Sequence, residues 1–359
     1  MRALSATEQS VPWDDSCPVM TLGGPGSEVF RAGSLDGERY VAVRLWCGTS
    51  RDEVECALAR VKQASLVEHA TLARVEACEA RGNAAVWIVS EYVPGPSLDA
   101  WASAGRRLPL PSVIDLVRNI SLGAHAAIRQ GITHHAIQPS NLVIWRQDRS
   151  SNGLRLDAKL LDLGMAAWMQ PEPPELEAAH FMAPETLAAV LDDYDPSELI
   201  DARANVYSCG ALLYYLATGA LPFRSAGLLE LSDAQTDGKL WGPRAHNPEI
   251  SAAFETVILG ALSVNRSARY ANPGELASAL DAVTWRDSYV PPDPGPVTVT
   301  QRKPPPPLPR VSKLDALAKT QRLPSVAVPE AADGDITLRS RMTAWSLLRN
   351  ALRDGRSQH

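Results

Sequence analysis

Short runs of β-branched and aromatic residues dominate the first hundred positions of the chain. Three of these runs, VFRAG, YVAVRLW and VWIVSEYV, are separated by turns that contain glycine, a pattern typical of strands. The stretch from Arg51 to about Leu66 lies between the second and third runs. There Val54, Leu58 and Val61 recur at helical spacing, with charged residues on the other faces. The pattern predicts a small β-rich lobe with one helix packed on its sheet.

Helical spacing of apolar residues characterises the part of the chain that follows. Ala, Leu and Ile recur at this spacing in three stretches, at about Leu98–Arg129, Val206–Thr218 and Ala252–Leu262. After Tyr289 the periodicity gives way to Pro, Thr and basic residues. We therefore expect an N-terminal extension at 1–17 and a folded region at 18–285, divided into a small lobe at about 18–93 and a mainly helical lobe at about 94–285.

The C-terminal part of the chain has a different composition. Residues 286–336 are rich in Pro and Thr and lack the periodicity needed to bury a core, so we expect a flexible, disordered linker. Within it, KPPPPLPR favours polyproline II, either as a stiff spacer or as a ligand for an aromatic groove. Residues 337–355 predict a basic amphipathic helix, which would dock on its own domain, on a partner or on an acidic membrane surface.

Composition and charge narrow the classes of function. A chain of 359 residues with 45% hydrophobic residues can bury a substantial core. The net charge of −6 argues against a nucleic-acid partner, which would need a basic face. The chain has no uninterrupted stretch of roughly 18 apolar residues, the length needed to cross a membrane, and the N-terminus does not predict a signal peptide. The cysteines are odd in number and without metal-ligand spacing, which favours a reducing, cytoplasmic location: Cys17, Cys47, Cys56, Cys78 and Cys209.

Eight short motifs follow one another along the folded region. In order they are LGGPGSEVF, VAVR, SEYVPGPSL, ITHHAIQPSNLVI, LLDLGMA, FMAPE, DARANVYSCGALLYYLATGALPF and NRSARY. Their order and spacing resemble the signature set of protein kinases, of the bacterial, eukaryotic-like Ser/Thr type. The resemblance covers about 18–285 and implies an α+β, bilobal protein-kinase fold. It also implies ATP and Mg²⁺ as the cofactors that such a cleft takes.

Three positions depart from the chemistry that the resemblance implies. Arg44 stands where the family has the strand lysine that holds the first two phosphates. Ala136 stands at the catalytic aspartate and Gln138 at the lysine that touches the transferred phosphate. A methyl group cannot accept a proton, and no Asp or Glu occurs from Leu116 to Gln147 to replace it. General-base assistance is typically worth about 10²- to 10⁴-fold in rate.

The helix glutamate that pairs with the strand lysine in the family also lacks an obvious counterpart. Family spacing places this position near Arg60, although Glu53 and Glu55 lie within reach. With Arg60 at this position, two cations would face each other, and the helix would not dock in the active pose.

Other positions of the nucleotide site are retained in part. The nucleotide-binding candidates are the turn glycines, the strand arginine and the hinge: Gly23, Gly24, Gly26, Arg44, Glu91 and Val93. The turn is equally compatible with an ordinary β-hairpin. Asn141 and Asp162 occupy the metal-ligand positions, and their oxygens suit Mg²⁺. The alternative is that both side chains brace the backbone without a metal.

Regulatory and structural positions complete the resemblance. His135 replaces the arginine that would receive an activating phosphate, and residues 162–185 contain no Ser, Thr or Tyr to carry one. Glu185 and Arg269 match the family's buried ion pair, and His134 matches a structural histidine beneath the site. Asn205 replaces an aspartate that braces the catalytic loop, which predicts a relaxed loop geometry.

The hypothesis that follows is a pseudokinase that acts as a regulatory or scaffold protein in Ser/Thr phosphorylation signalling, binding ATP without efficient phosphotransfer. Its protein partners would meet the helical lobe, the Pro-rich linker or the terminal helix. One alternative is a Ser/Thr kinase with atypical residual activity, supported by Asn141 and Asp162. Another is an interaction scaffold that does not need a nucleotide.

Overall fold

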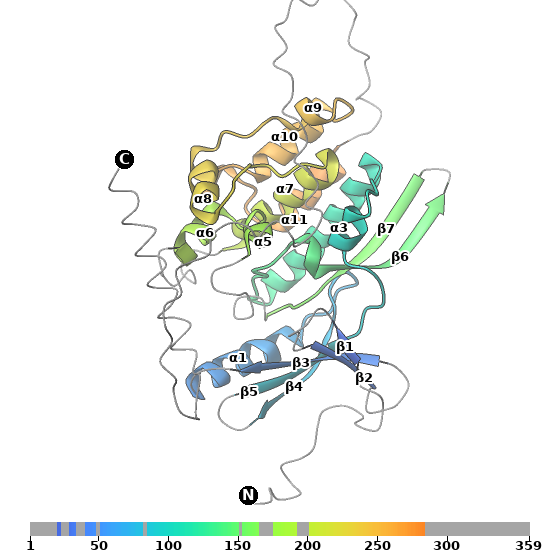
Figure 1. Cartoon of the computed structure of the whole chain (residues 1–359), viewed down its shortest axis with the longest axis vertical. Helices are drawn as coiled ribbons and strands as arrows, with labels where there is room; N and C mark the ends of the chain where they lie inside the picture. The colour runs from blue at the N-terminus through green and yellow to red at the C-terminus, as the bar shows by residue number, and fades with distance from the viewer. Residues whose placement is uncertain are drawn as a thin grey trace, which may run out of the picture. The chain divides into compact units, whose positions relative to one another are not determined.

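The computed structural model describes residues 20–22, 29–33, 40–47, 51–81, 85–150, 153–164, 175–191 and 201–283. Figure 1 shows their arrangement. The expected extension at 1–17, linker at 286–336 and terminal helix at 337–355 lie outside the described residues, as do Gly23, Gly24 and Gly26. None of the helices in the described ranges is long and apolar enough to cross a membrane.

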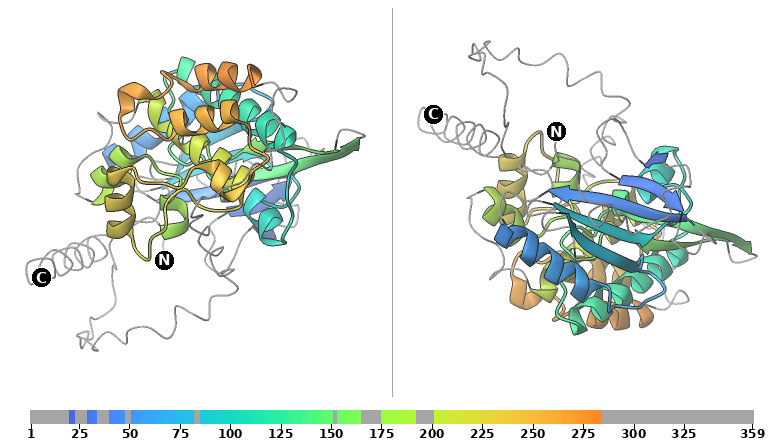
Figure 2. Two further views of the ribbon diagram at one scale, coloured as in Figure 1. Left: turned by 90° about the horizontal axis from the view of Figure 1, so that it is seen from above. Right: turned by 90° about the horizontal axis from the view of Figure 1, so that it is seen from below.

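The small lobe is a five-stranded antiparallel sheet with one helix. The strands lie in the order β1-β2-β3-β5-β4 and comprise β1 Met20–Leu22, β2 Val29–Gly33, β3 Tyr40–Cys47, β4 Val75–Arg81 and β5 Ala85–Glu91. The helix α1 Arg51–Ala64 follows β3 and contacts β4 and β5. Val54 and Val61 are buried in this contact, as their helical spacing predicts. The sheet and α1 are seen from below in the right panel of Figure 2.

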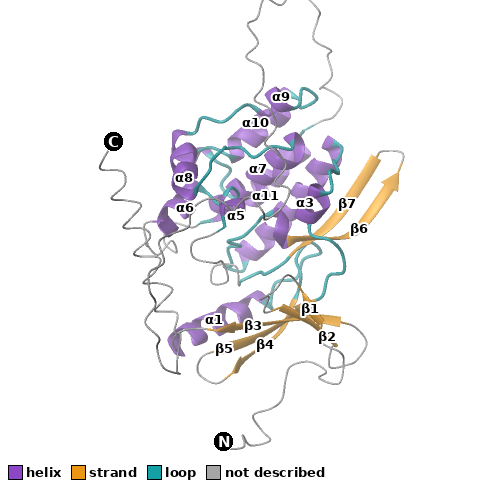
Figure 3. Cartoon of the chain, in the orientation of Figure 1, coloured by secondary structure: helices purple, strands orange, loops and turns teal. Residues whose placement is uncertain are grey.

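The large lobe is mainly helical, as predicted. Figure 3 shows the strands of the small lobe gathered apart from these helices. The α-helices are α2 Leu98–Ser103, α3 Leu110–Arg129, α5 Leu176–Ala179, α6 Pro184–Leu191, α7 Ala202–Thr218, α8 Leu228–Asp237, α9 Pro243–His246, α10 Ala252–Ala261 and α11 Pro273–Asp281. The 3₁₀ turns are η2 Pro139–Asn141 and η4 Arg266–Ala268.

The helix α7 forms the centre of this lobe and contacts α3, α10 and α11. Gly210 allows the close approach to α10, because a Cβ there would lie 2.7 Å from the Cβ of Ala261. The helix begins at Asp201, whose carboxylate accepts a hydrogen bond from Arg203 N–H, and ends at Gly219 with φ 72°. Aspartate is a favoured residue at the N-cap of a helix, and glycine is favoured at the C-terminal end, where the backbone is left-handed.

A two-stranded hairpin was not predicted for the large lobe. It consists of β6 Leu142–Ser150 and β7 Gly153–Leu160 and extends away from the helices in Figures 1 and 2. Its inner end is buried, at Leu142 and Leu160, whereas its outer end carries alternating charged residues. Because the apolar residues gather at one end, the hairpin shows no clear alternation over its full length. The buried end anchors the residues that follow β7 beneath the small lobe.

Candidate functional site

Two loops of the large lobe meet beneath the small lobe. One runs from α3 to β6 and contains the motif ITHHAIQPSN, and the other follows β7 and contains Asp162. Leu161 N–H donates to the Asn141 carbonyl at 2.8 Å, which places the residue before Asp162 directly beside the first loop. The structure therefore brings together the two residues, Asn141 and Asp162, that the sequence predicts as metal ligands.

His134 holds the first loop against the second. Its Nε2 donates to the Leu161 carbonyl at 2.7 Å, and its Nδ1 accepts from Ala136 N–H at 3.2 Å. These partners require the neutral tautomer with the proton on Nε2. Burial lowers the pKa of His134 to about 4, in agreement with a neutral ring. His134 thus fixes the shape of the loop from within the core.

Asn205 of α7 supports the same loop from below. In the amide orientation that satisfies both side-chain atoms, its Nδ2 donates to the His134 carbonyl at 2.5 Å and its Oδ1 accepts from His134 N–H at 3.2 Å. An amide can both donate and accept, which a carboxylate cannot. The substitution of asparagine for aspartate therefore keeps the loop braced, and the relaxed loop geometry that the sequence suggested is not observed.

Ala136 is 5% exposed at the tip of this braced loop. Its N–H is bound by His134, and its carbonyl accepts from Asn141 Nδ2 at 3.1 Å. Asn141 therefore uses its amide nitrogen to brace the backbone, which is the alternative that the sequence left open. The loop retains its hydrogen bonds although the catalytic-aspartate position carries only a methyl group.

Arg44 reaches across from β3 to Asp162. Its Nη2 lies 3.0 Å from both carboxylate oxygens of Asp162, and the two side chains are 24% and 18% exposed. Asp162 adopts φ 64°, the one non-glycine residue with positive φ in the described ranges. Among the described side chains Arg44 pairs with this aspartate, whereas Glu55 of α1 bonds Arg51 on the exposed face of the helix.

The helix α1 is docked on the segment that contains Asp162. A Cβ on Gly164, whose φ is 75°, would lie 2.8 Å from the Cβ of Ala64 and 3.4 Å from the carbonyl oxygen of Arg60. The end of α1 therefore packs against this segment, and whether the helix adopts the active pose stays a prediction. The carboxylate of Asp162 compensates the charge of Arg44, which weakens the repulsion expected between Arg44 and Arg60.

His135 lies in the same region. Burial is the main cause that lowers its pKa to about 4, and the neighbouring His134 and Arg60 lower it further. The imidazole is therefore neutral at pH 7, so it is not a cationic receptor for a phosphate. The activation segment at 165–174 lies outside the described residues.

The hinge between the lobes is held by an ion pair that the sequence did not predict. Lys159 Nζ lies 2.5 Å and 2.7 Å from the carboxylate oxygens of Glu91, which also accepts from Arg74 N–H at 3.2 Å. Lys159 pairs with Val143 across the hairpin and so faces the hinge. The carboxylate of Glu91 is thus engaged. The sequence did single out Lys159, because it is the one lysine between Lys62 and Lys239.

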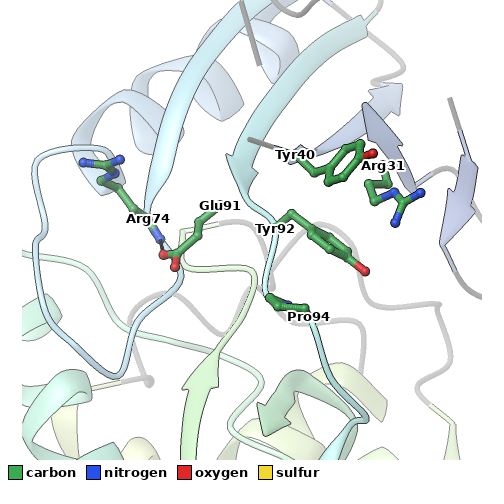
Figure 4. Close-up of a pocket in the computed structure, with 6 residues that line it drawn as sticks. All are labelled: Arg31, Tyr40, Arg74, Glu91, Tyr92 and Pro94. Carbon is green, nitrogen blue, oxygen red and sulfur yellow. Dashed lines mark hydrogen bonds between the residues drawn. The ribbon is translucent and has the colours of Figure 1, made fainter. Parts of the chain in front are cut away.

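Val93, the other hinge candidate, is buried with Ala73 and Val143, and Leu161 packs against this cluster. It forms an apolar surface between the hinge and the start of the hairpin. Beside the hinge, a hollow of about 640 Å³ is lined by Arg31, Tyr40, Arg74, Glu91, Tyr92 and Pro94. Figure 4 shows Arg31, Tyr40 and Tyr92 on one side of the chain and Glu91 with Arg74 on the other. This lining includes none of the residues of the Arg44–Asp162 pair.

The residues at the site do not fit a Mg²⁺ ion in this arrangement. Mg²⁺ needs oxygen ligands in near-ideal octahedral geometry. Both oxygens of Asp162 accept from Arg44, whereas Asn141 donates to the Ala136 carbonyl through its amide nitrogen and so offers its Oδ1 as a single oxygen ligand. In the described part of the chain, no group of three or more His, Cys, Asp or Glu side chains could hold a metal ion. A cation at Asp162 would have to displace a guanidinium.

Glu185 and Arg269 form a buried ion pair in the large lobe. Arg269 donates from Nη1 and Nη2 to the two Glu185 oxygens at 2.7 Å and 2.9 Å, and its side chain is fully buried. Its Nε donates to the Ser263 carbonyl at 2.6 Å, and its Cζ lies 5.0 Å from the centre of the Tyr207 ring. This bidentate geometry is the strong form of the arginine–carboxylate interaction.

Comparison with known proteins agrees with this arrangement. The family model described as "Protein kinase domain" matches residues 20–280. Serine/threonine-protein kinase Pkn1 of Myxococcus xanthus is 30% identical over 195 residues, which are 54% of this chain and 27% of that protein. Serine/threonine-protein kinase PknJ of Mycobacterium tuberculosis is 25% identical over 299 residues, which are 79% of this chain and 48% of that protein. The chain thus spans about half or less of the length of these curated relatives.

A solved structure extends the comparison to the fold. The crystal structure of Rad53 1-466 in complex with AMP-PNP superposes with a TM-score of 0.56 at 18% identity, covering 74% of this chain and 64% of that one. Identity at this level supports the fold alone. With the family match over most of the folded region, these findings establish that the chain belongs to the protein kinase superfamily, as a bacterial, eukaryotic-like member.

Proposed function

We propose that this chain is a pseudokinase, a regulatory member of its family that does not transfer phosphate efficiently. The observation that carries the proposal is Ala136, a buried methyl group at the position of the catalytic base, whose backbone is held by hydrogen bonds to His134 and Asn141. The loop has kept its shape while losing the group that would accept the proton of a substrate hydroxyl. The loss of that group is typically worth about 10²- to 10⁴-fold in rate.

Two further features support the same conclusion. Gln138 carries no charge where the family's lysine would meet the transferred phosphate, the point at which negative charge develops. Asp162 is neutralised by Arg44, so its carboxylate is not available to position a metal-bound phosphate. The scaffold, in contrast, is intact, because Glu185 and Arg269 form their ion pair. The chain has thus lost residues needed for phosphotransfer but has kept the fold.

The absence of a phosphorylation switch supports a role that is independent of catalytic activation. Residues 162–185 contain no Ser, Thr or Tyr, and His135 is neutral at pH 7. We propose that the chain acts in Ser/Thr phosphorylation signalling by presenting its helical lobe, the Pro-rich linker and the C-terminal helix to protein partners. The relatives that match are named Ser/Thr kinases, which supports this setting.

A second candidate is a kinase with residual activity. It is favoured by the hydrogen bond between Leu161 N–H and the Asn141 carbonyl, which keeps Asn141 beside Asp162. The two candidates differ in whether the protein transfers any phosphate.

Transfer of the γ-phosphate from radiolabelled ATP to the full-length chain and to a general protein substrate tests the proposal. We expect the signal to equal that of Asp162→Ala, prepared in the same way, which measures contaminating kinases. Arg51→Ala, which removes an exposed arginine outside the cleft, serves as a matched control for handling. Transfer by the native chain that Asp162→Ala abolishes would show the residual kinase and overturn the pseudokinase proposal.

A further inference from the structure

Arg44 occupies a position from which it can join Asp162 to a phosphate. The strand register pairs Arg44 with Val29 of β2 and with Ile88 of β5, so that the arginine lies in the centre of the sheet. From there its guanidinium reaches Asp162, 118 residues later in the chain.

The guanidinium has donors to spare. Nη2 makes both hydrogen bonds to Asp162, and Arg44 has no other hydrogen-bond partner among the residues that the structure describes. Arginine carries five N–H donors in a planar fork, and the three on Nε and Nη1 make no hydrogen bond to any residue that the structure describes. The side chain is 24% exposed and hence accessible to a ligand from solvent. Three donors on a permanent cation match the oxygens of a phosphate group.

This arrangement supplies what a bridging metal would otherwise supply. A carboxylate and a phosphate repel each other, and a cation between them is needed to hold both. Arg44 already lies against the carboxylate, with its free edge available for a second anion. A divalent cation placed on Asp162 would face this guanidinium at close range and would be repelled by it.

We infer that the cleft binds the phosphates of a nucleoside triphosphate directly through Arg44, with the guanidinium in place of the divalent cation, so that binding does not require Mg²⁺. This inference rests on the proposed function, because it assumes a site that binds a nucleotide without transferring its phosphate efficiently. The cluster of Ala73, Val93 and Val143 at the hinge offers apolar side chains for the base.

The test is equilibrium binding of a fluorescent N-methylanthraniloyl ATP to the full-length chain, in EDTA and in Mg²⁺. We expect the two dissociation constants to agree within about twofold. Arg44→Ala should weaken binding in EDTA by about tenfold or more, since it removes charge-assisted hydrogen bonds. In this variant Mg²⁺ should restore part of the affinity, because Asp162 is released. Asp162→Asn should still bind in EDTA, and Arg51→Ala, as the matched control, should bind like the native chain.

Two results would overturn the inference. One is binding by the native chain that needs Mg²⁺, and the other is no binding in either condition. Both come from the native protein, so neither depends on the folding of a variant. Arg44→Lys adds a second comparison, because it keeps the charge but lacks the planar fork that joins two anions. The absence of phosphotransfer is measured in a separate assay, so the pseudokinase proposal stands or falls independently of this result.

Discussion

Removing the carboxylate of Glu185 should destabilise the large lobe strongly. In Glu185→Gln, Arg269 would remain buried with its charge uncompensated, because its other partners are the neutral carbonyls of Ser263, Arg203 and Val264. Breaking one side of a buried ion pair costs about 3–5 kcal/mol. An amide oxygen still accepts one of the two hydrogen bonds, so we expect a value toward the lower end of this range.

Thermal unfolding followed by circular dichroism provides the measurement. For domains of roughly this size, each kcal/mol lowers the melting temperature by about 2–4 °C, so the expected decrease is about 6–12 °C for a loss of about 3 kcal/mol. The matched control is Glu55→Gln, which breaks the exposed pair with Arg51. Such an exposed i,i+4 pair contributes about 0.3–0.5 kcal/mol. If both variants melt within about 2 °C of the native chain, the reasoning from burial is refuted.

A double substitution separates charge burial from packing. Replacing Glu185 by Leu together with Arg269 by Met removes both charges and keeps most of the volume. Buried ion pairs can often be replaced by apolar residues without net loss, because the cost of removing two charges from water disappears. We therefore expect the double variant to be more stable than Glu185→Gln. A double variant that is less stable would show that the carbonyl bonds of Arg269 dominate.

Three further predictions concern the hinge, the catalytic loop and the lobe core. Lys159→Met removes the partner of Glu91 and should lower the free energy of unfolding by about 1 kcal/mol, a modest value because both side chains are partly exposed; an unchanged urea midpoint would contradict it. Burial lowers the pKa of His134 from 6.5 to about 4, so the unfolded chain binds more protons than the folded chain between these values. The free energy of unfolding should therefore fall as the pH decreases from 6.5 to 4, and the fall should be smaller in His134→Gln; equal slopes in urea titrations would exclude this origin. Gly210→Ala should lower the free energy of unfolding by about 1–3 kcal/mol, because the added methyl group overpacks the contact of α7 with α10. Gly227→Ala is the control, since an added Cβ there meets nothing within 4 Å. An equal loss of melting temperature in both variants would argue against the close contact.

The chain departs from the kinase motifs mainly in charge. The cationic strand position is kept as Arg44, the acidic position as Asp162, and the two neutralise each other. The neutral residues Ala136, Gln138 and His135 stand at three positions where phosphotransfer or its regulation would use a charge. A protein that presents surfaces to partners needs the packing of the lobes but not these charges, which is consistent with the proposed function.

The sequence alone predicted the two lobes and the substitutions at the catalytic positions of the motifs. The helical spacing of Val54 and Val61 predicted α1, and runs of β-branched residues predicted β2, β3 and β5. β4, which carries VEACEAR, was missed because its charged residues dilute the strand signal. The replacement of the catalytic base at Ala136 stays a prediction, and it rests on the motif alone, since a methyl group cannot accept a proton.

Only the tertiary structure decided which charges meet. Arg44 was expected to face α1, but it lies against Asp162, 118 residues away, because the two lobes bring β3 over the end of β7. Lys159 meets Glu91 across 68 residues for the same reason. Local patterns specify strands and helices through neighbouring residues, whereas an ion pair depends on distances that form only when the elements pack. The partner of Arg44, on which metal-free binding depends, was therefore beyond the reach of the sequence.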